Sequence, residues 1–110
     1  PLEVLKLGDA PVEEGRVVLS SLYCSSPYET SESLTVSGTA VRIIEITLGS
    51  YDKVQWLDIT GCPAIQSVTL NSYYLKTLYV TAGQKSAIDA QQIVINDQNY
   101  PTSQLEIKVR

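Results

Sequence analysis

The sequence lacks three side chains entirely: its 110 residues include no histidine, no methionine and no phenylalanine. Without histidine, the chain cannot form a catalytic or zinc site that depends on imidazole. Lysine and arginine number 8 against 12 aspartate and glutamate residues, and without a basic cluster nucleic acid is not expected as a partner. No apolar run approaches the roughly 18 residues of a transmembrane helix, so no membrane span is expected within this chain.

Charged residues are sparse, at 18% of the chain, whereas there are seven tyrosines and one tryptophan. A chain of this length is expected to form one domain with a single modest core. Translated chains begin with Met and this one begins with Pro1. We therefore expect a processed form or an excised fragment, whose signal peptide or anchor lies outside the sequence.

Short strand-like runs recur along residues 2–80 in the pattern apolar-x-x-apolar-x-apolar. The last two apolar positions face the same side of a strand, and the first points into the same interior from beyond a bend. From the second unit onward, the first residue of each unit lies 22, 23, 24 and 21 residues before the first residue of the next unit but one. Two strand units in each period of this length predict a β-rich solenoid. The seven units begin at Leu2, Leu19, Ser31, Val41, Val54, Ile65 and Leu75.

The pattern is most regular over residues 54–84. The sequence there reads LDITGCPAIQSVTL from Leu57 to Leu70, followed by LKTLYV from Leu75 to Val80. This segment resembles the leucine-rich repeats of surface and secreted proteins from Bacteroides-type gut bacteria. The resemblance implies a right-handed leucine-rich-repeat-like superhelix, a location at the cell envelope or outside the cell, and a binding or adhesive role without catalytic residues.

The resemblance divides the chain into a repeat solenoid over residues 1–84 and a C-terminal cap over residues 85–110. In the cap, residues 86–92 favour one or two helical turns, and residues 93–95 and 105–109 read as short strands. Solenoids need such terminal elements to close the core; the alternative is that these strands simply extend the sheet. A β-sandwich is the alternative fold, because it also has strands every 8 to 12 residues.

Aromatic and hydroxyl side chains gather on the predicted outer face of one row of strands. The residues before and between the last two apolar positions of each unit face outward. Trp56 and Tyr79 are thereby placed on neighbouring strands, about 5 Å apart. An exposed Trp–Tyr pair suits a sugar ring or a protein partner, although it also fits plain cross-strand packing or cover by the cap. The candidate ligand-binding residues are Ser33, Thr35, Trp56, Asp58, Thr77 and Tyr79.

The two cysteines, Cys24 and Cys62, fall in opposite strand rows and more than one coil apart. That separation exceeds the roughly 7 Å between Cα atoms that a disulfide bond can span. We therefore expect two buried free thiols that pack as small apolar side chains.

The spacing of the carboxylates in the sequence predicts neither an acid and base pair across a cleft nor a calcium loop. We expect no catalytic residue, no metal site and no cofactor. The predicted function is that of a non-enzymatic leucine-rich-repeat binding module, secreted or on the bacterial cell surface, which contacts an unidentified protein or glycan through its sheet face. The alternative is a structural spacer or terminal repeat domain of a larger surface protein, with no ligand of its own.

Overall fold

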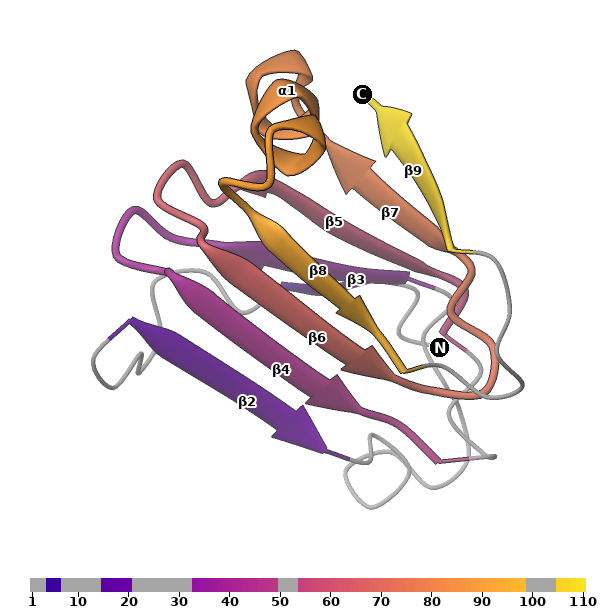
Figure 1. Cartoon of the computed structure of the whole chain (residues 1–110). Coiled ribbons are helices and arrows are strands. Elements are labelled where there is room, and N and C mark those ends of the chain that lie inside the picture. Colours follow the sequence, from indigo (N-terminus) through magenta and orange to yellow (C-terminus); the bar gives the residue numbers. More distant parts are fainter. Residues whose placement is uncertain (1–3, 7–14, 21–32, 50–53, 99–104) are drawn as a thin grey trace.

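Nine strands and one helix make up the described part of the computed structural model (Figure 1). The structure describes residues 4–6, 15–20, 33–49, 54–98 and 105–110. Helix α1 covers Ala82–Asp89 and comes between β7 and β8 along the chain. The strands are β1 (Val4–Lys6), β2 (Arg16–Ser20), β3 (Ser33–Ser37), β4 (Ile43–Thr47), β5 (Trp56–Gly61), β6 (Ser67–Asn71), β7 (Thr77–Val80), β8 (Val94–Asp97) and β9 (Glu106–Val109).

The strands alternate between two sheets. The odd-numbered strands form a five-stranded sheet in the order β1-β3-β5-β7-β9, and the even-numbered strands form a four-stranded sheet in the order β2-β4-β6-β8. Every ladder between neighbours is parallel. Parallel strands need a long crossover connection, and between β3 and β7 each crossover contains a strand of the opposite sheet.

The core lies between the inner faces of the two sheets. The residues that the sequence pattern assigned to it are confirmed as buried in the four units that begin at Val41, Val54, Ile65 and Leu75, where no core position is more than 5% exposed. Leu34 and Val36 of β3 are also buried. Burial of each such aliphatic side chain contributes about 1.5–3 kcal/mol to stability.

The predicted β-rich solenoid, a leucine-rich-repeat-like superhelix with coils of about 22 residues, is wrong. A leucine-rich repeat combines one strand with a helix or a 3₁₀ segment and lines a curved horseshoe, whereas here both halves of the period form regular strands of two parallel sheets. The result is a two-layer globule with a radius of gyration of 13.0 Å and extents of 39 × 30 × 22 Å. Parallel ladders also exclude the antiparallel β-sandwich for the described strands.

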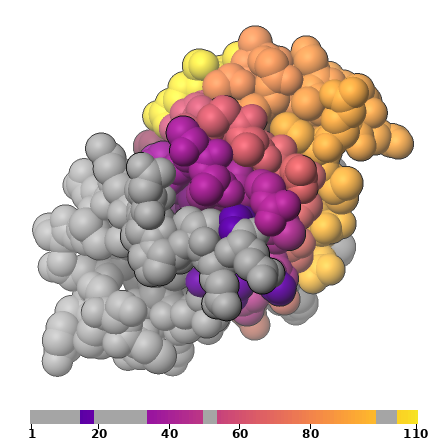
Figure 2. All heavy atoms as spheres, turned by 90° about the vertical axis from the view of Figure 1, so that its left-hand side faces the viewer, coloured from indigo at the N-terminus to yellow at the C-terminus, as the bar shows by residue number. Residues whose placement is uncertain are grey.

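The region predicted as a cap continues both sheets. Strand β8 pairs with β6, and β9 pairs with β7, so the orange and yellow residues of the C-terminal part gather at one end of the molecule (Figure 2). Helix α1 begins four residues earlier than the predicted helical turns, because Thr81 and Gln84 form a capping box. The Gln84 amide also donates to the carbonyls of Ile59 and Cys62, at 2.8 and 3.1 Å, which ties the helix to the turn after β5.

Cys62 is buried and its thiol is free, as predicted. The thiol donates a hydrogen bond to the carbonyl oxygen of Val36 at 3.1 Å. Burial, together with the nearby negative charge of Asp58, raises the pKa of Cys62 to about 11. The other cysteine, Cys24, lies outside the described residues.

Cys62 should therefore resist alkylation in the folded protein. At pH 8 the thiol is almost entirely protonated and shielded from solvent, and the thiolate is the reactive form. Peptide-resolved mass spectrometry after iodoacetamide treatment should find Cys62 unmodified in buffer and modified in denaturant. Rapid labelling of Cys62 under native conditions would contradict the buried position.

A close approach of two strands requires a glycine at position 61. The register between β3 and β5 shifts between Thr35 and Ser37, which brings Ser37 beside Gly61. A Cβ atom added at Gly61 would lie 2.6 Å from the Cβ of Ser37. In contrast, a Cβ added at Gly83 in α1 would have its nearest neighbour at 3.9 Å.

We predict opposite effects for two glycine substitutions. Gly61→Ala should lower the free energy of unfolding by about 1–3 kcal/mol, because the new methyl group overlaps Ser37. Gly83→Ala should raise it by about 0.5–1 kcal/mol, because alanine restricts the unfolded chain and favours the helix. Urea denaturation followed by circular dichroism measures both, and equal effects of the two variants would argue against the close strand contact.

Candidate functional site

The outer face of the five-stranded sheet carries the residues that the sequence singled out. The register aligns Ser33, Trp56 and Thr77 in one row across β3, β5 and β7. The next row contains Thr35, Asp58 and Tyr79. The grouping of these residues on one sheet is therefore as predicted, although the side chain of Ser33 lies outside what the structure describes.

Trp56 and Tyr79 contact each other as diagonal neighbours on this face. Their ring centroids lie 5.8 Å apart and the ring planes meet at 78°, which is an edge-to-face arrangement. The residue directly opposite Trp56 in the register is Thr77, and the one opposite Tyr79 is Asp58. Such an aromatic pair contributes about 0.5–1.5 kcal/mol beyond the burial of its surface.

The exposure of the candidate residues is lower than the sequence predicts. Trp56 and Tyr79 are half-buried rather than exposed. Thr77 is only 7% exposed, so it supports the face from within and offers little surface to a ligand. Thr35 and Asp58 are half-buried.

Asp58 is held at the centre of this face by two partners. One carboxylate oxygen accepts hydrogen bonds from the Thr60 amide at 2.8 Å and the Thr60 hydroxyl at 2.6 Å. The other oxygen forms an ion pair with the guanidinium group of Arg110. Burial alone would raise the pKa of Asp58, but the hydrogen bonds from Thr60 and the charge of Arg110 outweigh it and hold the pKa below 3.8, its ordinary value.

Arg110 also belongs to the site, although it was not among the predicted residues. Its guanidinium carbon lies 4.3 Å from the centroid of the Tyr79 ring, in a cation–π contact. The backbone amide of Arg110 donates to the carbonyl of Val80 at 2.9 Å, so the β7–β9 ladder brings the last residue of the chain beside Tyr79. We define the aromatic face as Trp56, Tyr79, Asp58 and Arg110.

The sequence contained a signal for Arg110 that the division into repeats and cap obscured. Glu106, Lys108 and Arg110 alternate with apolar residues, which predicts that all three point to one face of a strand. Once β9 is recognised as the neighbour of β7, this alternation places charged side chains beside Thr77 and Tyr79.

Two hollows of about 420 Å³ each lie beside α1. Neither is lined by a charged residue, so neither contains a proton donor or acceptor suited to acid–base catalysis. Within the described part of the chain, no three histidine, cysteine, aspartate or glutamate side chains are grouped to hold a metal ion. The first hollow is lined by Thr60, Pro63, Ile65, Thr81, Gly83, Gln84, Ala87, Gln92 and Ile93, and the second hollow by Ile88, Gln91, Ile93, Val94 and Ile95.

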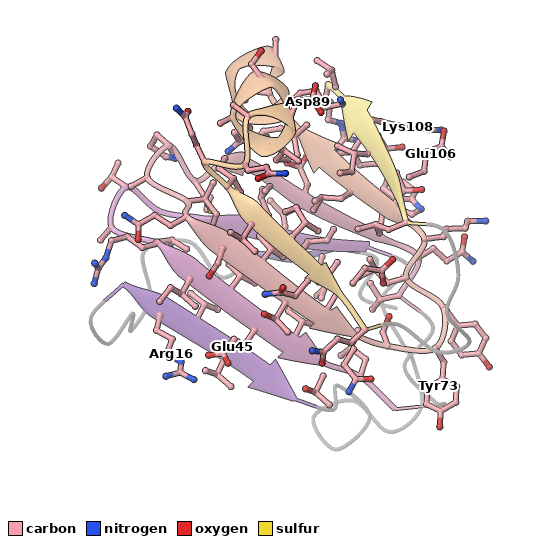
Figure 3. All side chains as sticks on the ribbon, in the orientation of Figure 1. Arg16, Glu45, Tyr73, Asp89, Glu106 and Lys108 are labelled. Atoms are coloured by element: carbon pink, nitrogen blue, oxygen red, sulfur yellow. The ribbon has the colours of Figure 1, made fainter. Side chains whose placement is uncertain are left out.

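The outer face of the four-stranded sheet carries polar side chains together with the exposed Val18 and Val94, and contains no aromatic residue among those described. Arg16 of β2 and Glu45 of β4 form an ion pair there (Figure 3). The Asn96 amide donates to the Thr69 hydroxyl at 3.2 Å. The aromatic character of the opposite face therefore distinguishes the two surfaces. In the part of the chain that the structure describes, no helix has the length and apolar character needed to cross a membrane.

Comparison with known proteins adds no relative: no protein-family model, no curated protein and no solved structure matches this chain.

The low pKa of Asp58 predicts a loss of stability at acidic pH. A carboxyl group with a depressed pKa in the folded state stabilises the protein above its ordinary pKa, and that contribution is lost as the pH falls through the lower, folded-state value. Asp58→Asn keeps the shape but removes the charge, and should lower the free energy of unfolding at pH 7 by on the order of 1 kcal/mol.

The difference between wild type and Asp58→Asn should shrink as the pH falls below 3.8, where wild-type Asp58 also becomes neutral. Urea denaturation at a series of pH values measures it. Asp89→Asn is the matched control, because Asp89 pairs with Lys85 on the exposed side of α1, and it should change stability little. A difference between wild type and Asp58→Asn that stays constant with pH would contradict the ion pair with Arg110.

Proposed function

We propose that this protein is a non-catalytic binding module that contacts a protein or glycan partner through the aromatic face of its five-stranded sheet. The observation that carries the proposal is the edge-to-face pair of Trp56 and Tyr79, supported by Asp58 and Arg110. A location at the cell surface or outside the cell is part of the proposal, and it rests only on the resemblance of residues 54–84 to repeats of surface proteins.

The residue types of the aromatic face favour binding. Tryptophan, tyrosine and arginine are the residues most often found to dominate the affinity of protein interfaces. Aromatic rings also stack on apolar faces of ligands while their polar groups form hydrogen bonds. Trp56 is only partly buried, so part of its surface is available to a partner.

The face is held in place before any partner binds. Tyr79 contacts Trp56 on the neighbouring strand and the Arg110 guanidinium. Arg110 is in turn fixed by Asp58, whose other oxygen is bound by Thr60. Side chains that are already ordered lose little conformational entropy on binding, and this increases affinity.

The test is a binding screen with matched variants on the two sheet faces. Wild type, Trp56→Ala and Tyr79→Ala are applied to a glycan array and used in pull-down assays with purified surface proteins. We expect both substitutions to weaken binding by about tenfold or more, the effect of removing a dominant interface residue.

Thr69→Ala is the control, because Thr69 lies on the outer face of the four-stranded sheet and should leave binding unchanged. Circular dichroism must show that each variant is folded. If wild type binds and neither aromatic substitution weakens it, the aromatic face is not the contact surface. If wild type binds no glycan or protein, the structural-spacer alternative takes precedence.

A further inference from the structure

Strand β9 is the last strand of the five-stranded sheet, and no described strand lies beyond it. The amides of Glu106 and Arg110 donate to the carbonyls of Lys76 and Val80, at 2.8 and 2.9 Å. Even-numbered residues of β9 thus direct their backbone groups toward β7. Because successive residues of a strand direct these groups to opposite sides, Leu105, Ile107 and Val109 direct theirs toward the open edge.

The side chains of β9 alternate between charged and apolar. Glu106 and Lys108 extend to the same side of the strand (Figure 3), with side chains 64% and 48% exposed, and form a loose ion pair with 3.7 Å between Lys108 Nζ and Glu106 Oε1. Ile107 packs against the core and is half-buried, whereas Val109 is 54% exposed. An open edge with exposed apolar side chains is a template for pairing with another strand.

We infer that this edge is the interface of a symmetric dimer, in which β9 pairs antiparallel with β9 of a second copy. A two-fold axis through Ile107 places Ile107 opposite its own copy and Leu105 opposite Val109. These are the residues whose N–H and C=O groups face the open edge, so all of them join the new ladder. The inference goes beyond the proposed function, since it concerns a different surface and a different partner.

Charge selects this register over its neighbours. With the axis at Ile107, Glu106 of each copy lies opposite Lys108 of the other. An axis at Glu106 would place two glutamates opposite each other, and an axis at Lys108 two lysines, which destabilises a strand pair. The axis at Lys108 would also set Glu106 opposite Arg110, but Arg110 is already paired with Asp58. An axis between residues would set outward-facing side chains against inward-facing ones. The sequence Leu105–Val109 is therefore complementary to itself in one antiparallel register.

The dimer has a consequence for the aromatic face. A two-fold axis perpendicular to the sheet joins two five-stranded sheets edge to edge and leaves both aromatic faces on the same side. The two β7 strands, which carry Tyr79, then lie three strand spacings apart, or about 14 Å. Two identical surfaces on one rigid sheet bind a repeating ligand with greater avidity than either alone.

The test uses charge reversal on the 110-residue chain with nothing appended after Arg110. Sedimentation velocity from about 1 μM to about 1 mM covers the range in which a pairing of this kind dissociates. Wild type should form a dimer. Glu106→Lys and Lys108→Glu should each weaken dimerisation by about tenfold or more, because each creates two like-charge contacts across the axis. The double variant E106K/K108E should restore it.

Arg16→Glu in β2 is the matched control, since it reverses one exposed charge on the far strand of the four-stranded sheet and should leave dimerisation unchanged. Circular dichroism confirms that each variant is folded. A wild-type chain that stays monomeric at every concentration would overturn the proposal and leave the edge to a strand of another protein. Dimerisation that persists in both single reversals, or fails to return in the double variant, would overturn it as well.

Discussion

Burial of aliphatic columns between the two parallel sheets is the interaction on which the rest of the structure depends. In the five-stranded sheet, one column passes through Leu34, Leu57, Leu78 and Ile107, which are aligned across β3, β5, β7 and β9. The first three are no more than 1% exposed. A shift of one residue in any strand would turn its apolar side chains to solvent, so this column fixes the register of the sheet.

The fixed register in turn builds the aromatic face. Once Leu57 and Leu78 are aligned, Trp56 and Asp58 must lie beside Thr77 and Tyr79 on the opposite side of the sheet. Alignment of Ile107 with Leu78 likewise brings the end of β9 beside Tyr79. The ion pair with Asp58 and the contact with the Tyr79 ring are then available to Arg110. The contacts of the candidate site thus follow from packing on the buried face of the same strands.

Sequence periodicity predicts which residues are buried and which strands are neighbours, because both follow from the alternation of side chains along a strand. It does not predict the architecture, because a period of about 22 residues fits any parallel arrangement in which two short segments alternate. Resemblance to a leucine-rich repeat suggested a curved superhelix, but regular strands in both halves form two parallel sheets instead. The Thr81 and Gln84 capping box, by contrast, was readable from the sequence as Thr-x-x-Gln and would have placed the start of α1 correctly.

Exposure was harder to predict than position, because it depends on residues distant in the chain. Tyr79 is predicted to face outward, but it is half-buried because Arg110, 31 residues further along the chain, lies over its ring. Thr77 is buried, although the residues that pair with it on the two neighbouring strands, Trp56 of β5 and Glu106 of β9, are not. The sequence predicts the face of the sheet on which a side chain lies, whereas the exposure of that side chain depends on tertiary contacts with distant residues.

The two sheets end differently, and the difference follows from the same columns. In the four-stranded sheet, the register places Asp97 of β8 beside Leu70, so a charged residue occupies the position where the apolar column would continue. In the five-stranded sheet, the equivalent positions beside Leu78 and Val80 are Ile107 and Val109. An inward-directed charge at an edge discourages further pairing, whereas an apolar edge favours it. The open side of β9 is therefore better suited to an additional strand than the open side of β8.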